Sequence, residues 1–113
     1  MNIQIFGTKK SADTRKAERF FKERGIRYQF IDLKEKGMSR GEFQSVAQAV
    51  GGVDALIDPS CRDKDLLALL QYLLPEDRQA KILENQHVLR QPVVCNGKAA
   101  AVGYAPDVWK SWM

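Results

Sequence analysis

The sequence is poor in the residues that build metal sites and disulfide frameworks. Its 113 residues include two cysteines, Cys61 and Cys95, and one histidine, His87. No ligand spacing typical of zinc is present, so we expect no metal site. The two cysteines lie far apart in the sequence, and we interpret them as free thiols in a reducing compartment.

The sequence also has no extended apolar segment. The stretch from Leu66 to Leu70 is one of the longest, and it is far shorter than the roughly 20 residues that span a bilayer. The first residues alternate polar and apolar side chains, which is not the pattern of a signal peptide. We therefore expect a cytoplasmic protein with no membrane partner.

Basic residues only slightly outnumber acidic ones. The formal net charge is +4 and the isoelectric point is near 9.2. This excess favours a solvated basic surface and, more weakly, an anionic partner. The sequence has no run of lysine and arginine with interleaved aromatic residues, so we expect no direct contact with nucleic acid.

Hydrophobic periodicity predicts both strands and helices. The elements expected in the first part are a strand over 3–7, a helix that Gly25 ends, and a strand over 26–33. About 39–90 is expected to be helical: Ser39 and Glu42 have the spacing of a capping box, Asp63 is placed to cap a leucine-rich helix, and Pro75 suits the first position of another. Asn96-Gly97 predicts a hairpin over 93–102, and Pro106 opens a last helix. We expect that helix to turn four side chains inward: Val108, Trp109, Trp112 and Met113.

This order of elements is that of a thioredoxin-like (glutaredoxin-like) α/β fold. Two parallel strands followed by an antiparallel hairpin give a mixed four-stranded sheet with helices on both faces. The chain has no linker, repeat or low-complexity segment. We therefore predict one domain over 1–113, with about 39–90 as an inserted helical subdomain.

The candidate functional site lies in the loop between the first strand and the first helix. A helix N-terminus presents free backbone N–H groups and a partial positive charge, and four cations stand beside it in the sequence: Lys9, Lys10, Arg15 and Lys16. Such a place attracts anions and lowers the pKa of a thiol. Position 11 is a serine, however, and serine is also among the best helix-capping residues.

The segment over residues 5–17, IFGTKKSADTRKA, resembles the N-terminal motif of the arsenate-reductase family. That family includes glutaredoxin-coupled arsenate reductases and Spx-type transcription regulators, and its motif is Gly-x-x-x-Cys followed by Arg-Lys-Ala. Ser11 falls on the family's cysteine, and Thr14 falls on a second cysteine that Spx-type members have. The resemblance continues over 25–30 and the helical insert, and then over 89–94, 96–98 and 102–104.

The resemblance implies a site and its partners. It assigns catalytic positions to Ser11, Arg15, Arg90 and Pro92, and contacts with an anion or with glutathione to Lys10, Ala12, Asp13 and Thr14. It implies a cis peptide bond before Pro92. It also implies glutathione or glutaredoxin as reductant, a small oxyanion as ligand, and no tightly bound cofactor.

Two departures from the family pattern bear on activity. A serine hydroxyl cannot form the thiolate adduct or the mixed disulfide that the family's reduction requires. The reductases also place an arginine directly before the proline, where this chain has Gln91. Arg90 lies one residue earlier and points to the opposite face of an extended segment, while Arg62 is a weak substitute.

Several alternatives stay open at this point. Ser11 is an ordinary helix cap, a retained anion- or thiol-binding residue, or a serine substituted for a native cysteine. The chain is accordingly a reductase-lineage protein with little or no reductase activity, an Spx-like regulatory module that binds a protein partner, or an active thiol oxidoreductase in its cysteine form. The substrate, the protein partner and the oligomeric state do not follow from the sequence.

Overall fold

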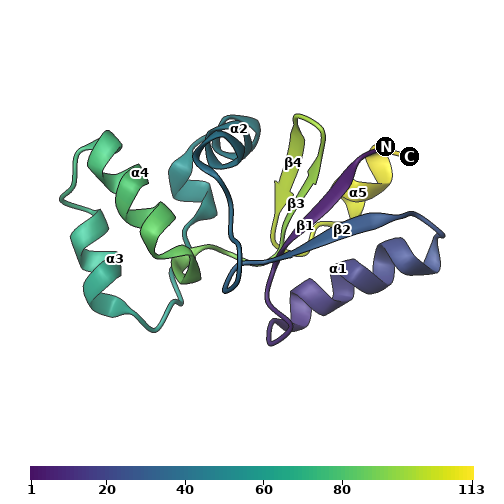
Figure 1. Cartoon of the computed structure of the whole chain (residues 1–113), viewed down its shortest axis with the longest axis horizontal. Coiled ribbons are helices and arrows are strands. Elements are labelled where there is room, and N and C mark those ends of the chain that lie inside the picture. The colour runs from purple at the N-terminus through teal and green to yellow at the C-terminus, as the bar shows by residue number, and fades with distance from the viewer.

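The alternating residues at the start of the chain form β1 (Ile3–Gly7), one of the two inner strands of a four-stranded sheet (Figure 1). The computed structural model describes residues 1–113. The other elements are α1 (Ala12–Glu23), β2 (Tyr28–Asp32), α2 (Arg40–Val50), the 3-10 helix η1 (Val53–Leu56), α3 (Lys64–Leu70), α4 (Pro75–Glu84), the 3-10 helix η2 (Gln86–Val88), β3 (Val93–Asn96), β4 (Ala99–Val102) and α5 (Pro106–Ser111).

The strand order β2-β1-β3-β4 confirms the predicted thioredoxin-like sheet. β1 pairs in parallel with β2, so that Ile5 lies opposite Phe30. β1 also pairs antiparallel with β3, and β3 pairs antiparallel with β4. Between β2 and β3 all the regular structure is helical, and no helix is long and apolar enough to cross a bilayer.

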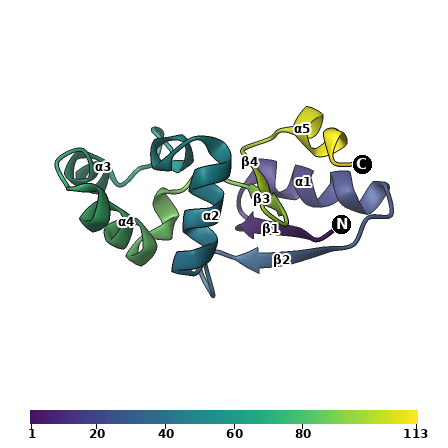
Figure 2. The same ribbon diagram turned by 90° about the horizontal axis from the view of Figure 1, so that it is seen from above.

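One face of the sheet packs against α1 and α5 (Figure 2). Alternate residues of β1, Ile3 and Ile5, point to this face and meet Phe21 of α1. Trp109 of α5 is fully buried there, with its ring centroid 5.1 Å from that of Phe20. Because α5 has only six residues, this contact is its principal anchor.

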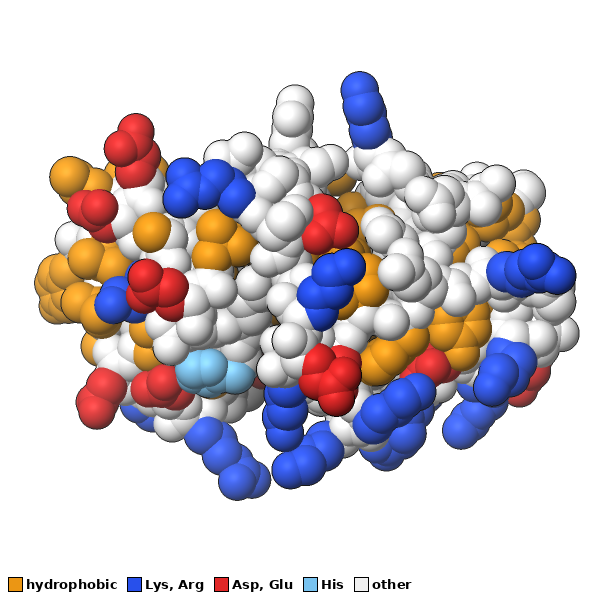
Figure 3. All heavy atoms as spheres, in the orientation of Figure 1, with side chains coloured by type: hydrophobic (Ala, Val, Ile, Leu, Met, Phe, Trp, Pro, Cys, Tyr) orange, Lys and Arg blue, Asp and Glu red, His pale blue; other side chains and the backbone are white.

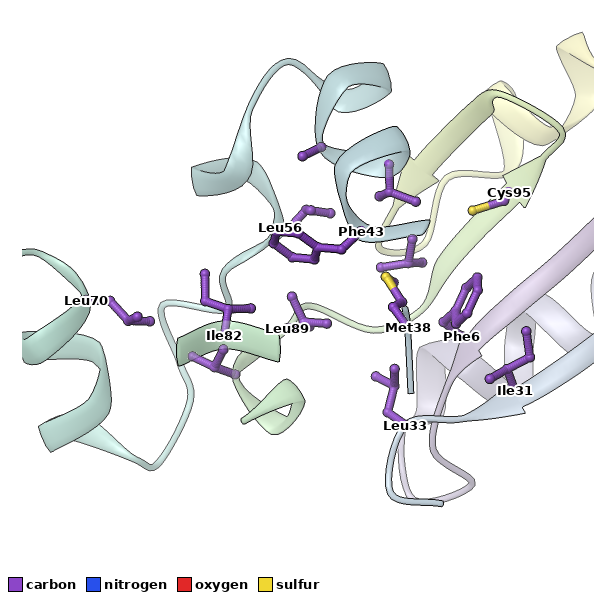
Figure 4. Packing of buried hydrophobic residues seen from close by; sticks show 14 of the residues in the cluster. Phe6, Ile31, Leu33, Met38, Phe43, Leu56, Leu70, Ile82, Leu89 and Cys95 are labelled. Carbon is purple, nitrogen blue, oxygen red and sulfur yellow. The ribbon is translucent and has the colours of Figure 1, made fainter. Parts of the chain in front are cut away.

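The other face packs against α2, and the same core continues into the helical insert (Figure 4). Phe6 of β1 and Phe43 of α2 are fully buried in this cluster. Ile82 of α4 and Leu89, just before β3, extend it away from the sheet. The insert is therefore continuous with the core of the sheet.

The helix starts predicted from the sequence are confirmed. Ser39 and Glu42 form a reciprocal capping box at α2. Asp63 caps α3 by accepting a hydrogen bond from the backbone N–H of Leu66, and its other carboxylate oxygen lies 2.9 Å from His87 Nε2. The hydrogen bond with His87 lowers the pKa of Asp63.

The C-terminal part differs from the prediction in two details. Asn96 pairs with Ala99 in the hairpin, so the turn is Gly97-Lys98, one residue later than expected. Gly97 has φ +61°, which suits the first central position of a tight hairpin turn. Trp109 of α5 faces inward and Trp112, the residue after the helix, is half-buried, whereas Val108 and Met113 are exposed. A helix of six residues buries only one narrow face, and Trp109 occupies that face.

Candidate functional site at the start of α1

The loop between β1 and α1 begins with a close approach that requires glycine. A Cβ atom on Gly7 would lie 2.4 Å from the Thr14 side-chain oxygen, a distance at which atoms overlap. Thr14 is fully buried, and its hydroxyl has no hydrogen-bond partner. Gly7 and Thr14 therefore fix how closely α1 packs on the end of β1.

Ser11 is the N-cap of α1. Its Oγ accepts a hydrogen bond from the backbone N–H of Thr14 at 3.2 Å, and its own N–H donates to the Thr8 carbonyl at 3.1 Å. The side chain is half-buried. The hydroxyl thus satisfies one of the free donors of the helix end, at the place where the family motif has its cysteine.

The cations beside this helix end are largely engaged within the chain. Lys9 pairs with Glu18 at 2.8 Å, and Arg15 Nη1 donates to the Lys9 carbonyl at 2.6 Å. Lys16 lies 3.8 Å from Asp13, whereas Lys10 is exposed and makes no ion pair. The basic loop predicted from the sequence therefore offers an anion less free positive charge than its composition indicated.

A second segment reaches the loop from the start of β3. The peptide bond between Gln91 and Pro92 is cis, as the resemblance implied. The Gln91 side-chain oxygen accepts hydrogen bonds from the Thr8 backbone N–H at 2.8 Å and from the Thr8 hydroxyl at 2.9 Å. The sequence did not predict this contact, although the resemblance had already placed an arginine of the reductases at position 91.

Arg90 lies beside the loop, but its side chain is bound to the helical insert. Its Nε donates to the carbonyl of Ile57 at 3.2 Å, and its side chain borders a hollow of about 300 Å³ shared with Gln91, Asp13 and Asp58. Two carboxylates in the same hollow oppose the binding of an oxyanion. Arg62, the weak substitute named above, is exposed and forms no ion pair.

Neither cysteine is available to replace a nucleophile at position 11. Cys95 lies on β3, buried in the core on the α2 side, and burial raises the pKa of its thiol to about 11. Cys61 lies in the insert, where its thiol donates to the His87 carbonyl with 3.8 Å between Sγ and O. Both are free cysteines.

The fold, together with a cis-proline segment that contacts the β1–α1 loop, defines a thioredoxin-like protein. No family model matches the sequence. The chain is 28% identical over 109 residues to the global transcriptional regulator Spx 2 of Oceanobacillus iheyensis, covering 95% of this chain and 80% of the regulator.

Two solved structures share the whole fold. An arsenate reductase from Vibrio cholerae superposes with a TM-score of 0.85 at 22% identity, and a Bacteroides fragilis protein described as ArsC family related superposes with a TM-score of 0.86 at 17% identity. Each comparison covers 100% of this chain and 98% of the other. The chain is therefore similar in sequence to an Spx-type regulator, and it has the thioredoxin fold of the arsenate-reductase structures.

The N-terminus of α1 leads to a prediction about anion binding. We expect sulfate to bind weakly and to shift the amide resonances of Ser11, Ala12 and Asp13 more than those elsewhere, because the helix end offers N–H donors beside Lys10. A titration followed by ¹⁵N–¹H NMR measures this. In an Asp13→Asn variant the shifts should grow, because the competing carboxylate is gone. Shifts spread evenly over the surface would contradict the prediction.

Proposed function

We propose that this chain does not carry out thiol-based reduction and acts instead as a regulatory module that binds a protein partner. The observation that carries the proposal is the use of Ser11 as a helix cap at the position of the family's nucleophile. An alcohol at this place cannot be oxidised to a disulfide or transfer electrons to an oxyanion. The surrounding contacts of Gln91 and Arg90 agree with a structural role for the loop.

The partner proposed for this module is RNA polymerase. The similarity to a global transcriptional regulator over 95% of the chain supports this choice, because Spx-type regulators act through contact with the polymerase. The module would meet that partner in the cytoplasm. Glutathione and arsenate are, in this proposal, not substrates of the chain.

The proposed function has a specific consequence for redox control. Ser11 and Thr14 stand where Spx-type members have two cysteines, so no disulfide can form across these positions. Binding of the purified chain to RNA polymerase from its source organism, measured by biolayer interferometry, should therefore be the same before and after treatment with diamide. A Cys61→Ser background removes the half-buried thiol as a source of interference.

A matched variant makes this test sharper. Ser11→Cys combined with Thr14→Cys restores the pair of thiols, and its binding should change on oxidation while that of the parent does not. Absence of polymerase binding by the parent chain would contradict the proposed partner. An equal response of parent and variant to diamide would contradict the role given to position 11.

A further inference from the structure

Helix α3 has apolar residues on its exposed side as well as on the side that packs against the core. Leu66 and Leu70 are buried, whereas Leu69 on the same helix is 42% exposed. Tyr72 and Leu74, in the turn that follows, are 85% and 71% exposed. Large apolar side chains that gather on a surface mark interaction sites. Leu69, Tyr72 and Leu74 together are called the helical tip.

Acidic side chains surround the helical tip. Asp65 lies one helical turn before Leu69, and Glu76 and Asp77 lie in the first turn of α4. Residues 63–77 contain four acidic residues and one cation. None of Asp65, Glu76 and Asp77 is in an ion pair. Figure 3 shows hydrophobic side chains with acidic ones around them at this end, over α3 and α4.

The opposite charge pattern is found where α1 meets α5. A groove of about 410 Å³ lies there, and it is called the basic groove. Its cations are Lys16, Arg19, Arg24 and Lys110, its one acidic residue is Glu23, and its remaining lining residues are Phe20, Tyr104 and Pro106. Tyr104 is 50% exposed. Arg19 and Lys110 form no ion pair and no side-chain hydrogen bond, so their charges are free for a partner.

The two surfaces complement each other in charge and in chemistry. We propose that the helical tip of one molecule docks in the basic groove of a second copy of this chain. The apolar tip side chains would meet the exposed ring of Tyr104, and the acidic rim would meet Arg19 and Lys110. A tip-to-tip dimer is disfavoured, because it would bring two acidic rims together.

The shape of the molecule makes this contact intermolecular and head-to-tail. The chain extends 43 Å along its longest axis, and both views place α3 and α4 at one end and α1 and α5 toward the other (Figures 1 and 2). A contact between two different surfaces does not close on itself unless the rotation forms a ring. Association therefore grows with protein concentration, and it weakens as salt screens the charges.

Sedimentation velocity over a range of concentrations at low and high salt tests the proposal. The parent chain should self-associate at low salt. Two variants should each stay monomeric, with association weakened about tenfold or more: a tip variant, Tyr72→Ser with Leu74→Ser, and a groove variant, Arg19→Glu with Lys110→Glu. All four positions have exposed side chains or line the open groove, and circular dichroism checks that each variant is folded.

Mixing the two variants provides the decisive measurement. The groove variant keeps an intact tip and the tip variant keeps an intact groove, so the mixture should form a one-to-one dimer that grows no further. Lys36→Glu with Lys98→Glu makes the same charge change at exposed positions outside the groove and should associate like the parent. A parent that stays monomeric, a groove variant that still associates, or a mixture without dimer would each overturn the proposal.

Discussion

Replacing Ser11 with cysteine is expected to create a thiol with a lowered pKa. The Ser11 side chain already accepts a hydrogen bond from the Thr14 backbone N–H at the start of α1, and the same donor would stabilise a thiolate. A free cysteine has a pKa of about 8.5, whereas thiols at such helix ends fall to roughly 3.5–7.5. Asp13, in the first turn of α1, opposes the shift. Arsenate turnover should nevertheless be poor, because Gln91 stands where the reductases have an arginine.

Thiolate absorbance against pH measures this effect, with Cys61 and Cys95 replaced so that only the new thiol titrates. Ser45→Cys is a matched control, since Ser45 is exposed in the middle of α2, away from the helix end. Its pKa should stay near that of a free cysteine. A Ser11→Cys thiol that titrates at or above the control would show that the helix end does not stabilise negative charge at position 11.

Replacing Trp109 with alanine is expected to give the largest loss of stability of any change in α5. Trp109 is fully buried, and its ring packs against Phe20, Phe21 and Tyr104 with centroids 5.1 to 5.6 Å apart. Substitutions of this kind cost about 3–5 kcal/mol. The indole N–H makes no hydrogen bond within the chain, so the expected loss comes from the burial and packing of the ring.

Urea denaturation followed by circular dichroism measures the change in the free energy of unfolding. Trp112→Ala is the matched control, because Trp112 directly follows α5 and is only half-buried. Its loss should be clearly smaller. Equal losses in the two variants would contradict the role of Trp109 as the anchor of α5.

Local patterns predicted much of the fold. The capping residues Ser39 and Asp63 identified two helix starts because capping depends on neighbours within one turn. The mixed sheet followed from the order of the elements. The side of α3 that stays exposed did not follow, because periodicity shows which residues share a face and not which face finds a partner. The exposure of Leu69 illustrates this limit.

The sequence predicted where the candidate site lies, but it did not predict how the charged side chains there are paired. The motif placed Ser11 at the start of α1, and the resemblance implied the cis bond before Pro92. The sequence did not reveal that Lys9 pairs with Glu18, two helical turns into α1, or that Gln91 holds Thr8 from 83 residues away. Such contacts depend on how α1 and β3 pack, which no local pattern contains.

We propose that the chain performs no thiol-based reduction, because Ser11 stands where the family motif has its nucleophilic cysteine. The most direct measurement is glutaredoxin- and glutathione-dependent arsenate reduction by the parent chain and by a variant with Cys61 and Cys95 both replaced by serine. We predict that both proteins match a control without protein. Turnover clearly above that control in the variant that lacks both cysteines would contradict this proposal.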